Sequence, residues 1–222
     1  MKPCAVTIVF FGDSITEGQH VDSSRRWTDL LADRLNRRYL DTPVGLNFLN
    51  KGISGETSRQ GLERFARDVQ QISPDIMTLE FGLNDCNCWI SDRGHPRNSL
   101  ASYRANLFEI IERARLFGAQ KVIVQTNHET LKRKIMLSGE SLETARKRYN
   151  NTMRQVAADT GATLCDIEKA FGPMTEAELE EILLPYPDHL HLSIAGHVRY
   201  AGIIQSYLER AIEQIVQEKT RG

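Results

Sequence analysis

The chain has 222 residues, of which 41% are hydrophobic and 26% charged, and its 28 basic residues nearly balance 29 acidic ones. We expect one globular domain over residues 1–222. The formal net charge of -1 excludes a global field that would attract nucleic acid or an anionic membrane, and no apolar run before residue 12 is long enough for a membrane span. A cytoplasmic protein without nucleic-acid partners or integral membrane association is expected, and its oligomeric state is not predicted.

Apolar runs of β type alternate along the chain with longer segments of helical periodicity. The β-type runs cover residues 5–11, 44–50, 75–81, 121–126 and 163–166. Helices are expected over residues 57–73, 103–117, 138–160 and 193–219. Because parallel strands need such crossover helices, the alternation predicts a three-layer α/β/α sandwich. Its centre would be a flavodoxin-like, doubly wound sheet of about five parallel strands.

Helix ends and cysteines add local detail. Thr57 and Gln60 fit a capping box at the start of the first of these helices, and Gly118 stands where a left-handed C-terminal cap is expected. The four cysteines, Cys4, Cys86, Cys88 and Cys165, show no disulfide framework. The Cys86-x-Cys88 pair lacks the second pair that a structural zinc site would need, so no metal is expected there.

Polar clusters follow the first three β-type runs. They are Gly-Asp-Ser-Ile-Thr at 12–16, Asn-Lys-Gly-Ile-Ser-Gly at 50–55 and Gly-Leu-Asn-Asp at 82–85, and a fourth, Asp-His-Leu-His at 188–191, precedes the last helix. Each cluster alone also fits an ordinary turn or helix cap. Ligands of an open parallel sheet bind outside the carboxyl ends of its strands. Together the clusters would supply a hydroxyl, an imidazole, a carboxylate and amide donors, which is a hydrolytic set.

In their order and residue types, these motifs resemble the SGNH (GDSL-type) hydrolases from Gly12 to His191. The resemblance implies ester hydrolysis without a cofactor or a metal. It makes Ser14 the nucleophile, His191 the general base and Asp188 the carboxylate that orients the base.

The same resemblance implies an oxyanion hole formed by the backbone N–H groups of Ser14 and Gly52 and the side-chain amide of Asn84. These roles agree with general chemistry, because a serine needs an imidazole to remove its proton and the developing negative charge needs fixed donors. The first strand is expected to stop at Gly12 so that a sharp turn presents Ser14, with Asp13 bracing that turn.

Two departures from the family pattern concern the last motif and the segment after the fourth strand. His189 lies beside Asp188 and competes for the role of base, but the three-residue spacing favours His191. Loop hydrogen bonding or a place in the pocket wall is expected for His189. The segment from Asn127 lacks the prolines common in relatives, which predicts a substrate floor with its own shape.

The natural substrate is the least specified feature. Asp13, Trp89 and Arg93 are candidate substrate-binding residues, and the stretches 86–98 and 127–140 are the expected determinants of specificity. A small protein without an obvious lid favours a small soluble ester as its substrate. We therefore expect it to deacetylate a carbohydrate or similar metabolite. A lysophospholipase or thioesterase is the alternative within the family.

Two other classes of function remain open at this stage. A metal hydrolase could use Asp188, His189, His191 and His197, although the histidine spacing differs from the i, i+4 pair that shares one helical face. A non-catalytic, flavodoxin-like binding module could hold phosphate in the loop 52–55 at the helix that begins near Thr57. The chain contains neither of the two usual glycine-rich phosphate motifs.

Overall fold

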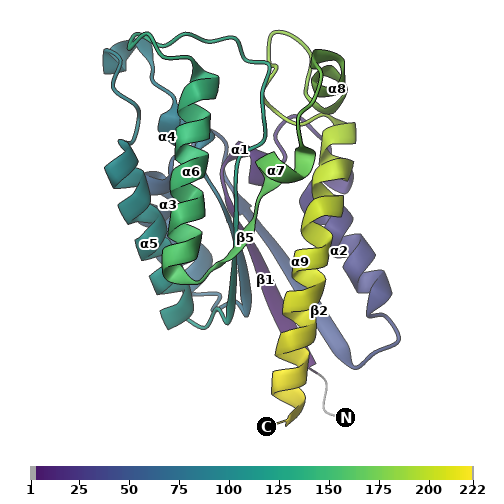
Figure 1. Cartoon of the computed structure of the whole chain (residues 1–222). Coiled ribbons are helices and arrows are strands. Elements are labelled where there is room, and N and C mark those ends of the chain that lie inside the picture. The colour runs from purple at the N-terminus through teal and green to yellow at the C-terminus, as the bar shows by residue number, and fades with distance from the viewer. Residues whose placement is uncertain (1–3, 222) are drawn as a thin grey trace.

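The computed structural model of the chain describes residues 4–221 and contains a five-stranded parallel sheet (Figure 1). The strands are β1 (Cys4–Gly12), β2 (Val44–Gly52), β3 (Ile76–Glu80), β4 (Lys121–Gln125) and β5 (Thr163–Cys165). Their spatial order is β2-β1-β3-β4-β5, and all neighbouring pairs are parallel. The predicted doubly wound sheet is therefore confirmed.

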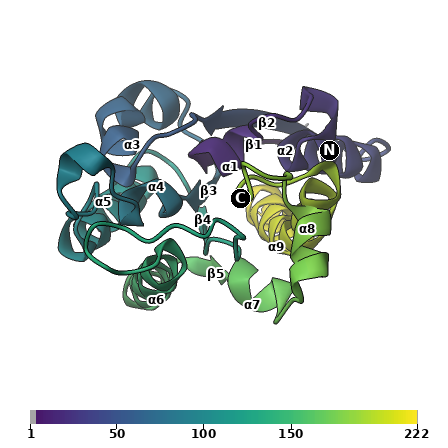
Figure 2. The same cartoon turned by 90° about the horizontal axis from the view of Figure 1, so that it is seen from above.

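Helices cover both faces of this sheet, as the view from above in Figure 2 shows. One face carries α2 (Trp27–Arg38), α7 (Ile167–Phe171), α8 (Glu176–Ile182) and α9 (Ile194–Arg221). The other carries α3 (Ser58–Phe65), α5 (Leu100–Leu116) and α6 (Leu142–Thr160). The one-turn helices α1 (Ser14–Glu17) and α4 (Leu83–Cys86) follow β1 and β3. Within residues 4–221, no helix is both long enough and apolar enough to cross a membrane.

Strand β1 lies between β2 and β3, and its mostly apolar sequence packs against helices on both faces of the sheet. Phe10 packs edge-on against Trp27 on one face, with ring centroids 5.0 Å apart, and Phe11 packs against Phe65 on the other at 5.6 Å. Successive side chains of a strand point to opposite faces, so a strand between two helical layers buries both. Phe10 and Phe11 are therefore both buried, one on each face of the sheet.

Three details differ from the sequence expectation. The helix predicted from residue 138 begins at Leu142, because Gly139 has a φ of 83° and the Ser141 side chain caps the helix by accepting from Thr144 N. The capping box of Thr57 and Gln60 is confirmed, but α3 passes into a π-helical segment after Phe65. The helices α2, α7 and α8 are not among the predicted elements.

Candidate active site

The carboxyl ends of three strands meet at one edge of the sheet. Gly12 at the end of β1 pairs in register with Gly52 on β2 and with Glu80 on β3. The chain leaves β1 toward Ser14 and leaves β3 toward Asn84, on either side of the point where the strand order reverses. In doubly wound sheets, ligands bind at this point.

The turn after β1 is sharp because Gly12 has no side chain. A Cβ there would lie 2.1 Å from Thr16 Oγ1 and 2.4 Å from the backbone oxygen of Glu80. Asp13 caps the helix that follows, since its Oδ1 accepts a hydrogen bond of 3.0 Å from Ile15 N. Ser14 is thereby held as the first residue of α1, as the sequence predicted.

Ser14 and two side chains of a loop that is distant in sequence form a hydrogen-bonded line. His191 Nε2 lies 3.0 Å from Ser14 Oγ, and His191 Nδ1 lies 2.7 Å from Asp188 Oδ2. The other carboxylate oxygen of Asp188 accepts from the backbone N–H groups of Leu190 at 3.0 Å and His191 at 2.7 Å. In this geometry, Nε2 of the imidazole can take a proton from the Ser14 hydroxyl while the Asp188 carboxylate holds the imidazole through Nδ1.

The hydrogen bonds around Asp188 also set its charge. Burial alone would raise the pKa of Asp188, but the hydrogen bonds from the backbone and ring of His191 and from Leu190 N outweigh burial and hold the pKa below its usual value. Asp188 is therefore ionised at neutral pH. A carboxylate in this state stabilises positive charge on the neighbouring imidazole.

A second carboxylate, Asp13, lies under Ser14 and has the opposite environment. It is completely buried, and its Oδ2 accepts a hydrogen bond of 3.1 Å from the side-chain amide of Asn84. Burial raises the pKa of Asp13 to about 6, although the hydrogen bonds from Ile15 and Asn84 oppose this shift. Asp13 thus orients the Asn84 amide, and its burial leaves it no access to a substrate.

Glu80 extends this buried group of acids. Its Oε2 accepts from Thr16 Oγ1 at 3.3 Å, while Oε1 has no hydrogen-bond partner among the described residues. Burial, and then the charge of Asp13, raise the pKa of Glu80 well above its usual value. The protonated form of Glu80 is therefore favoured, because burial and the neighbouring Asp13 charge both disfavour a second negative charge here.

Gly52 does not fit the predicted role of oxyanion donor. Its backbone N–H already donates to Asn50 Oδ1 at 2.8 Å. A Cβ at Gly52 would lie 2.1 Å from Glu17 N, so a glycine is needed here for close packing against α1. Three residues further on, Gly55 has a φ of 78°, and its N–H donates no hydrogen bond to any described residue.

Ser14 and His191 open into a cavity of about 320 Å³. Its other lining residues are Gln19, Ser54, Gly55, Leu83, Asn84, Asn87 and Leu190. Sequence reasoning gave Gln19, Ser54 and Asn87 no individual role, although Ser54 lies within the motif at 50–55 and Asn87 within the stretch 86–98. Trp89 and Arg93 do not line this cavity, and the exposed ring of Trp89 lies 4.3 Å under the guanidinium of Arg97.

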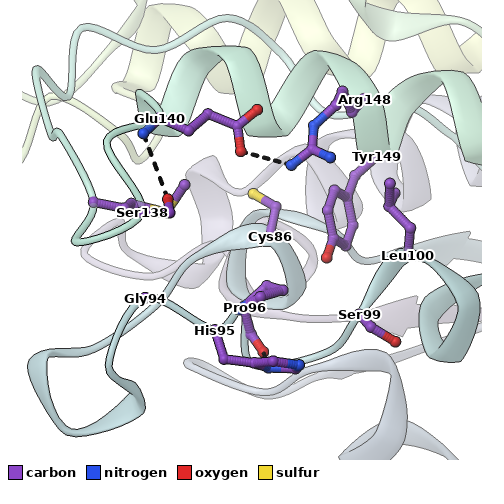
Figure 3. A pocket seen from close by; sticks show the side chains of 11 residues that line it. Cys86, Gly94, His95, Pro96, Ser99, Leu100, Ser138, Glu140, Arg148 and Tyr149 are labelled. Carbon is purple, nitrogen blue, oxygen red and sulfur yellow. Dashed lines mark hydrogen bonds and ion pairs between the residues drawn. The ribbon is translucent and has the colours of Figure 1, made fainter.

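The two stretches expected to set specificity meet in a different cavity of about 270 Å³ (Figure 3). Residues such as His95 and Pro96 line one side, and Ser138 and Glu140 line the other, with Glu140 bound to Arg148 at 2.6 Å. No lining residue is shared with the Ser14 cavity. Burial raises the pKa of the Cys86 thiol, so this cysteine is no thiolate nucleophile.

The four residues of the alternative metal set do not come together. His189 turns its ring toward Tyr186, with centroids 5.8 Å apart. His197 is buried in α9, where its Nδ1 accepts from Trp27 N at 3.2 Å, and burial lowers its pKa to about 4. Among the described residues, only Asp188 and His191 of this set belong to a group of potential metal ligands.

The sequence profile of the GDSL-like lipase/acylhydrolase family matches residues 10–199, which includes every motif described above. The chain belongs to this family. An arylesterase of Vibrio mimicus is 31% identical over 118 residues, which are 53% of each chain. An acetylxylan esterase of Geobacillus stearothermophilus is 25% identical over 207 residues, covering 86% of this chain and 88% of the relative.

Solved structures of an acetylxylan esterase and of a lipase/acylhydrolase share the fold. A structure of the Geobacillus acetylxylan esterase covers 92% of this chain and 94% of its own, with a TM-score of 0.72 at 22% identity. A lipase/acylhydrolase from Enterococcus faecalis gives a TM-score of 0.71 at 26% identity, with coverage of 91% and 95%. The chain spans about half the length of several curated relatives that it matches. The matched share is 53% for the arylesterase and 46% and 55% for two further relatives.

Proposed function

We propose that the chain is a serine esterase that hydrolyses carboxylic esters through an acyl intermediate on Ser14. The observation that carries the proposal is the line Ser14 Oγ, His191, Asp188, with separations of 3.0 and 2.7 Å. His191 Nε2 takes the hydroxyl proton as Ser14 Oγ bonds to the ester carbonyl carbon. His191 then gives this proton to the departing alcohol. A water molecule that loses a proton to His191 next attacks the acyl carbon, and the acid leaves as Ser14 Oγ regains its proton.

The oxyanion of each tetrahedral intermediate needs donors that are free and already in place. We assign this role to the N–H of Ser14, the N–H of Gly55 and the second N–H of the Asn84 amide. The first two make no hydrogen bond to described residues, and Ser14, Gly55 and Asn84 line the same cavity. Gly55 replaces Gly52 in this assignment. Fixed donors of this kind are worth several kcal/mol to a transition state.

The substrate we propose is a small acetyl ester, with an acetylated carbohydrate as the first candidate. The cavity of about 320 Å³ can hold a short acyl group, and Gln19, Ser54 and Asn87 place polar side chains in its wall that can bind hydroxyl groups. The relative matched over most of its length carries the name acetylxylan esterase, which agrees with this choice.

Aryl esters of increasing acyl length, from acetyl to dodecanoyl, test both parts of the proposal. A steep fall in kcat/KM beyond short acyl groups is expected, together with acetate release from an acetylated oligosaccharide. The Ser14→Ala variant serves as the control and should lack activity on every ester. Highest activity on the longest chains would instead identify a lysophospholipase or thioesterase, and full activity of Ser14→Ala would contradict the mechanism.

A further inference from the structure

His20 has no assigned role, yet its ring lies against that of His191. The two ring centroids are 5.3 Å apart, and the planes meet at 81°. His20 follows the turn after α1, has a φ of 68° and is exposed. Neither of its ring nitrogens hydrogen-bonds to a residue within 4–221. An imidazole with free nitrogens therefore stands at the edge of the proposed general base.

Asp188 completes a set of potential metal ligands with these two histidines. One ligand atom from each of His20, Asp188 and His191 lies within 4.8 Å of the other two, and no other such group occurs in the described part of the chain. Two imidazoles and one carboxylate, with a fourth position left for water, form a common ligand set for Zn²⁺.

The spacing of the two rings suits a shared zinc ion. With Zn–N bonds near 2.1 Å, a ring centre lies about 3.2 Å from the ion, so two rings at a tetrahedral angle stand about 5 Å apart. The observed separation is 5.3 Å. Tetrahedral ligand atoms are about 3.4 Å from each other, so the present group, whose atoms lie within 4.8 Å of one another, would close to that distance with a shift of at most about 1.4 Å. The exposed side chain of His20 is free to make this movement.

We propose that Zn²⁺ binds to His20, Asp188 and His191 and reversibly inhibits the enzyme. This inference rests on the proposed catalytic role of His191. Zinc bound to either ring nitrogen of that residue would inhibit the enzyme. Zinc on Nε2 occupies the lone pair that accepts the Ser14 proton. Zinc on Nδ1 displaces the proton bound there and breaks the hydrogen bond to Asp188 Oδ2, now 2.7 Å long. In both cases Ser14 loses its base.

Zinc titration of the initial hydrolysis rate tests the inhibition, with each protein normalised to its own rate in chelator. The variant is His20→Asn, because asparagine tolerates the left-handed backbone at this position and removes the imidazole. His189→Asn is the matched control, since His189 also has a positive φ, 53°, and lies next to Asp188 but outside the ligand group.

We expect the wild type and His189→Asn to be inhibited at the same zinc concentration and to recover with EDTA. His20→Asn should need at least about tenfold more zinc for half inhibition, the order of change that a lost partner at a metal site causes. Mg²⁺, which prefers six oxygen ligands, should have no effect on any of the three. Equal zinc sensitivity of His20→Asn and wild type would overturn the proposal.

A titration with Co²⁺ separates this proposal from the proposed function. The Ser14→Ala variant keeps all three ligands but cannot form an acyl-enzyme, so binding is followed without activity. Tetrahedral Co²⁺ should give intense visible absorption at one equivalent, which the further change His20→Asn removes. Absence of that spectrum in Ser14→Ala contradicts the metal site, even if esterase activity is found. Its presence supports the site, even if every ester tested proves inert.

Discussion

The turn at residues 12–18 and the loop at residues 183–192 each bring a carboxylate to Ser14, but in opposite environments. In the turn, Asp13 is completely buried, and burial raises its pKa to about 6. In the loop, the Asp188 side chain is 25% exposed, and hydrogen bonds that outweigh its burial lower its pKa. Only Asp188 faces an imidazole. The comparison teaches that the carboxylate next to Ser14 in sequence braces the turn, whereas the distant one holds the imidazole that we propose as the base.

The two regions also differ in how they are built. The turn is fixed by close packing of Gly12 and Gly52 against neighbouring backbone and side-chain atoms. The loop is closed by an antiparallel bridge between Leu183 and Leu192 and by the bond from Leu184 N to the His191 oxygen, 2.8 Å long. Substitutions in the turn should therefore affect stability as well as rate, and substitutions at the loop's polar tip should affect mainly rate.

The largest expected effect separates the two histidines of the loop. His191→Ala should reduce kcat by about 10⁴-fold or more, because Ser14 then has no proton acceptor. His189→Ala should cost far less, since the ring of His189 packs on Tyr186. Steady-state kinetics beside circular dichroism spectra make the comparison. A folded His191→Ala enzyme near the wild-type rate, beside an inactive His189→Ala, would reverse the assignment.

The two carboxylates can be compared by the same isosteric change. Asp188→Asn should lower kcat by about 10³- to 10⁴-fold with little change in fold, because the amide no longer favours the productive tautomer of His191. Asp13→Asn should cost clearly less, since an amide oxygen can still accept from Ile15 N. The kcat values of the two variants test this order, and a larger loss for Asp13→Asn would contradict the roles given to the two regions.

Asn84→Ala should lower kcat by about 10²- to 10³-fold while changing KM little, because its amide is asked to bind charge present mainly in the transition state. Michaelis–Menten analysis on a short aryl ester measures both constants. An unchanged kcat would remove Asn84 from the oxyanion hole and leave Asp13 without its proposed function of orienting that amide.

Alanine at Gly52, the last residue of β2, should destabilise the protein more than alanine at Gly55, three residues further on. Gly52→Ala places a Cβ 2.1 Å from Glu17 N, and overpacking of this kind costs about 1–3 kcal/mol or more. Gly55→Ala meets no atom within 4 Å and pays only for its φ of 78°, about 1–2 kcal/mol. Thermal unfolding should show the greater loss for Gly52→Ala. A greater loss for Gly55→Ala would mean that the close approach of β2 to α1 is not the controlling contact.

The last prediction concerns pH and the buried acids of the turn. Because the folded pKa of Glu80 lies well above its usual 4.5, native Glu80 holds a proton that the unfolded chain has lost, and this group's contribution to stability falls as pH rises above 4.5. Glu80→Gln removes that penalty. Its stability relative to wild type should rise between pH 5 and pH 8, by at most about 1.4 kcal/mol per pH unit. Urea unfolding at both pH values measures the difference, and a constant difference would contradict a raised pKa.

The sheet and the two functional regions could be predicted from sequence because each depends on local patterns. Strands β1, β3 and β4 are mostly buried, and the Asp188 carboxylate binds N–H groups only two and three residues away. The short helices α7 and α8 span too few residues to show a period. Two other features could not be predicted because they depend on tertiary contacts. Gly52 is unsuited as a donor because the Asn50 side chain folds back to accept from its N–H. The contact of His20 with His191 joins residues near opposite ends of the chain.

The central claim is that Ser14 is the nucleophile activated by His191, and covalent labelling tests it most directly. A serine-directed phosphonate should add one label per chain, and peptide mass spectrometry should place it on Ser14. Labelling should be absent in Ser14→Ala and much slower in His191→Ala, whose serine is still present but lacks its base. An active enzyme that takes no label, or takes it at a residue other than Ser14, would contradict the account.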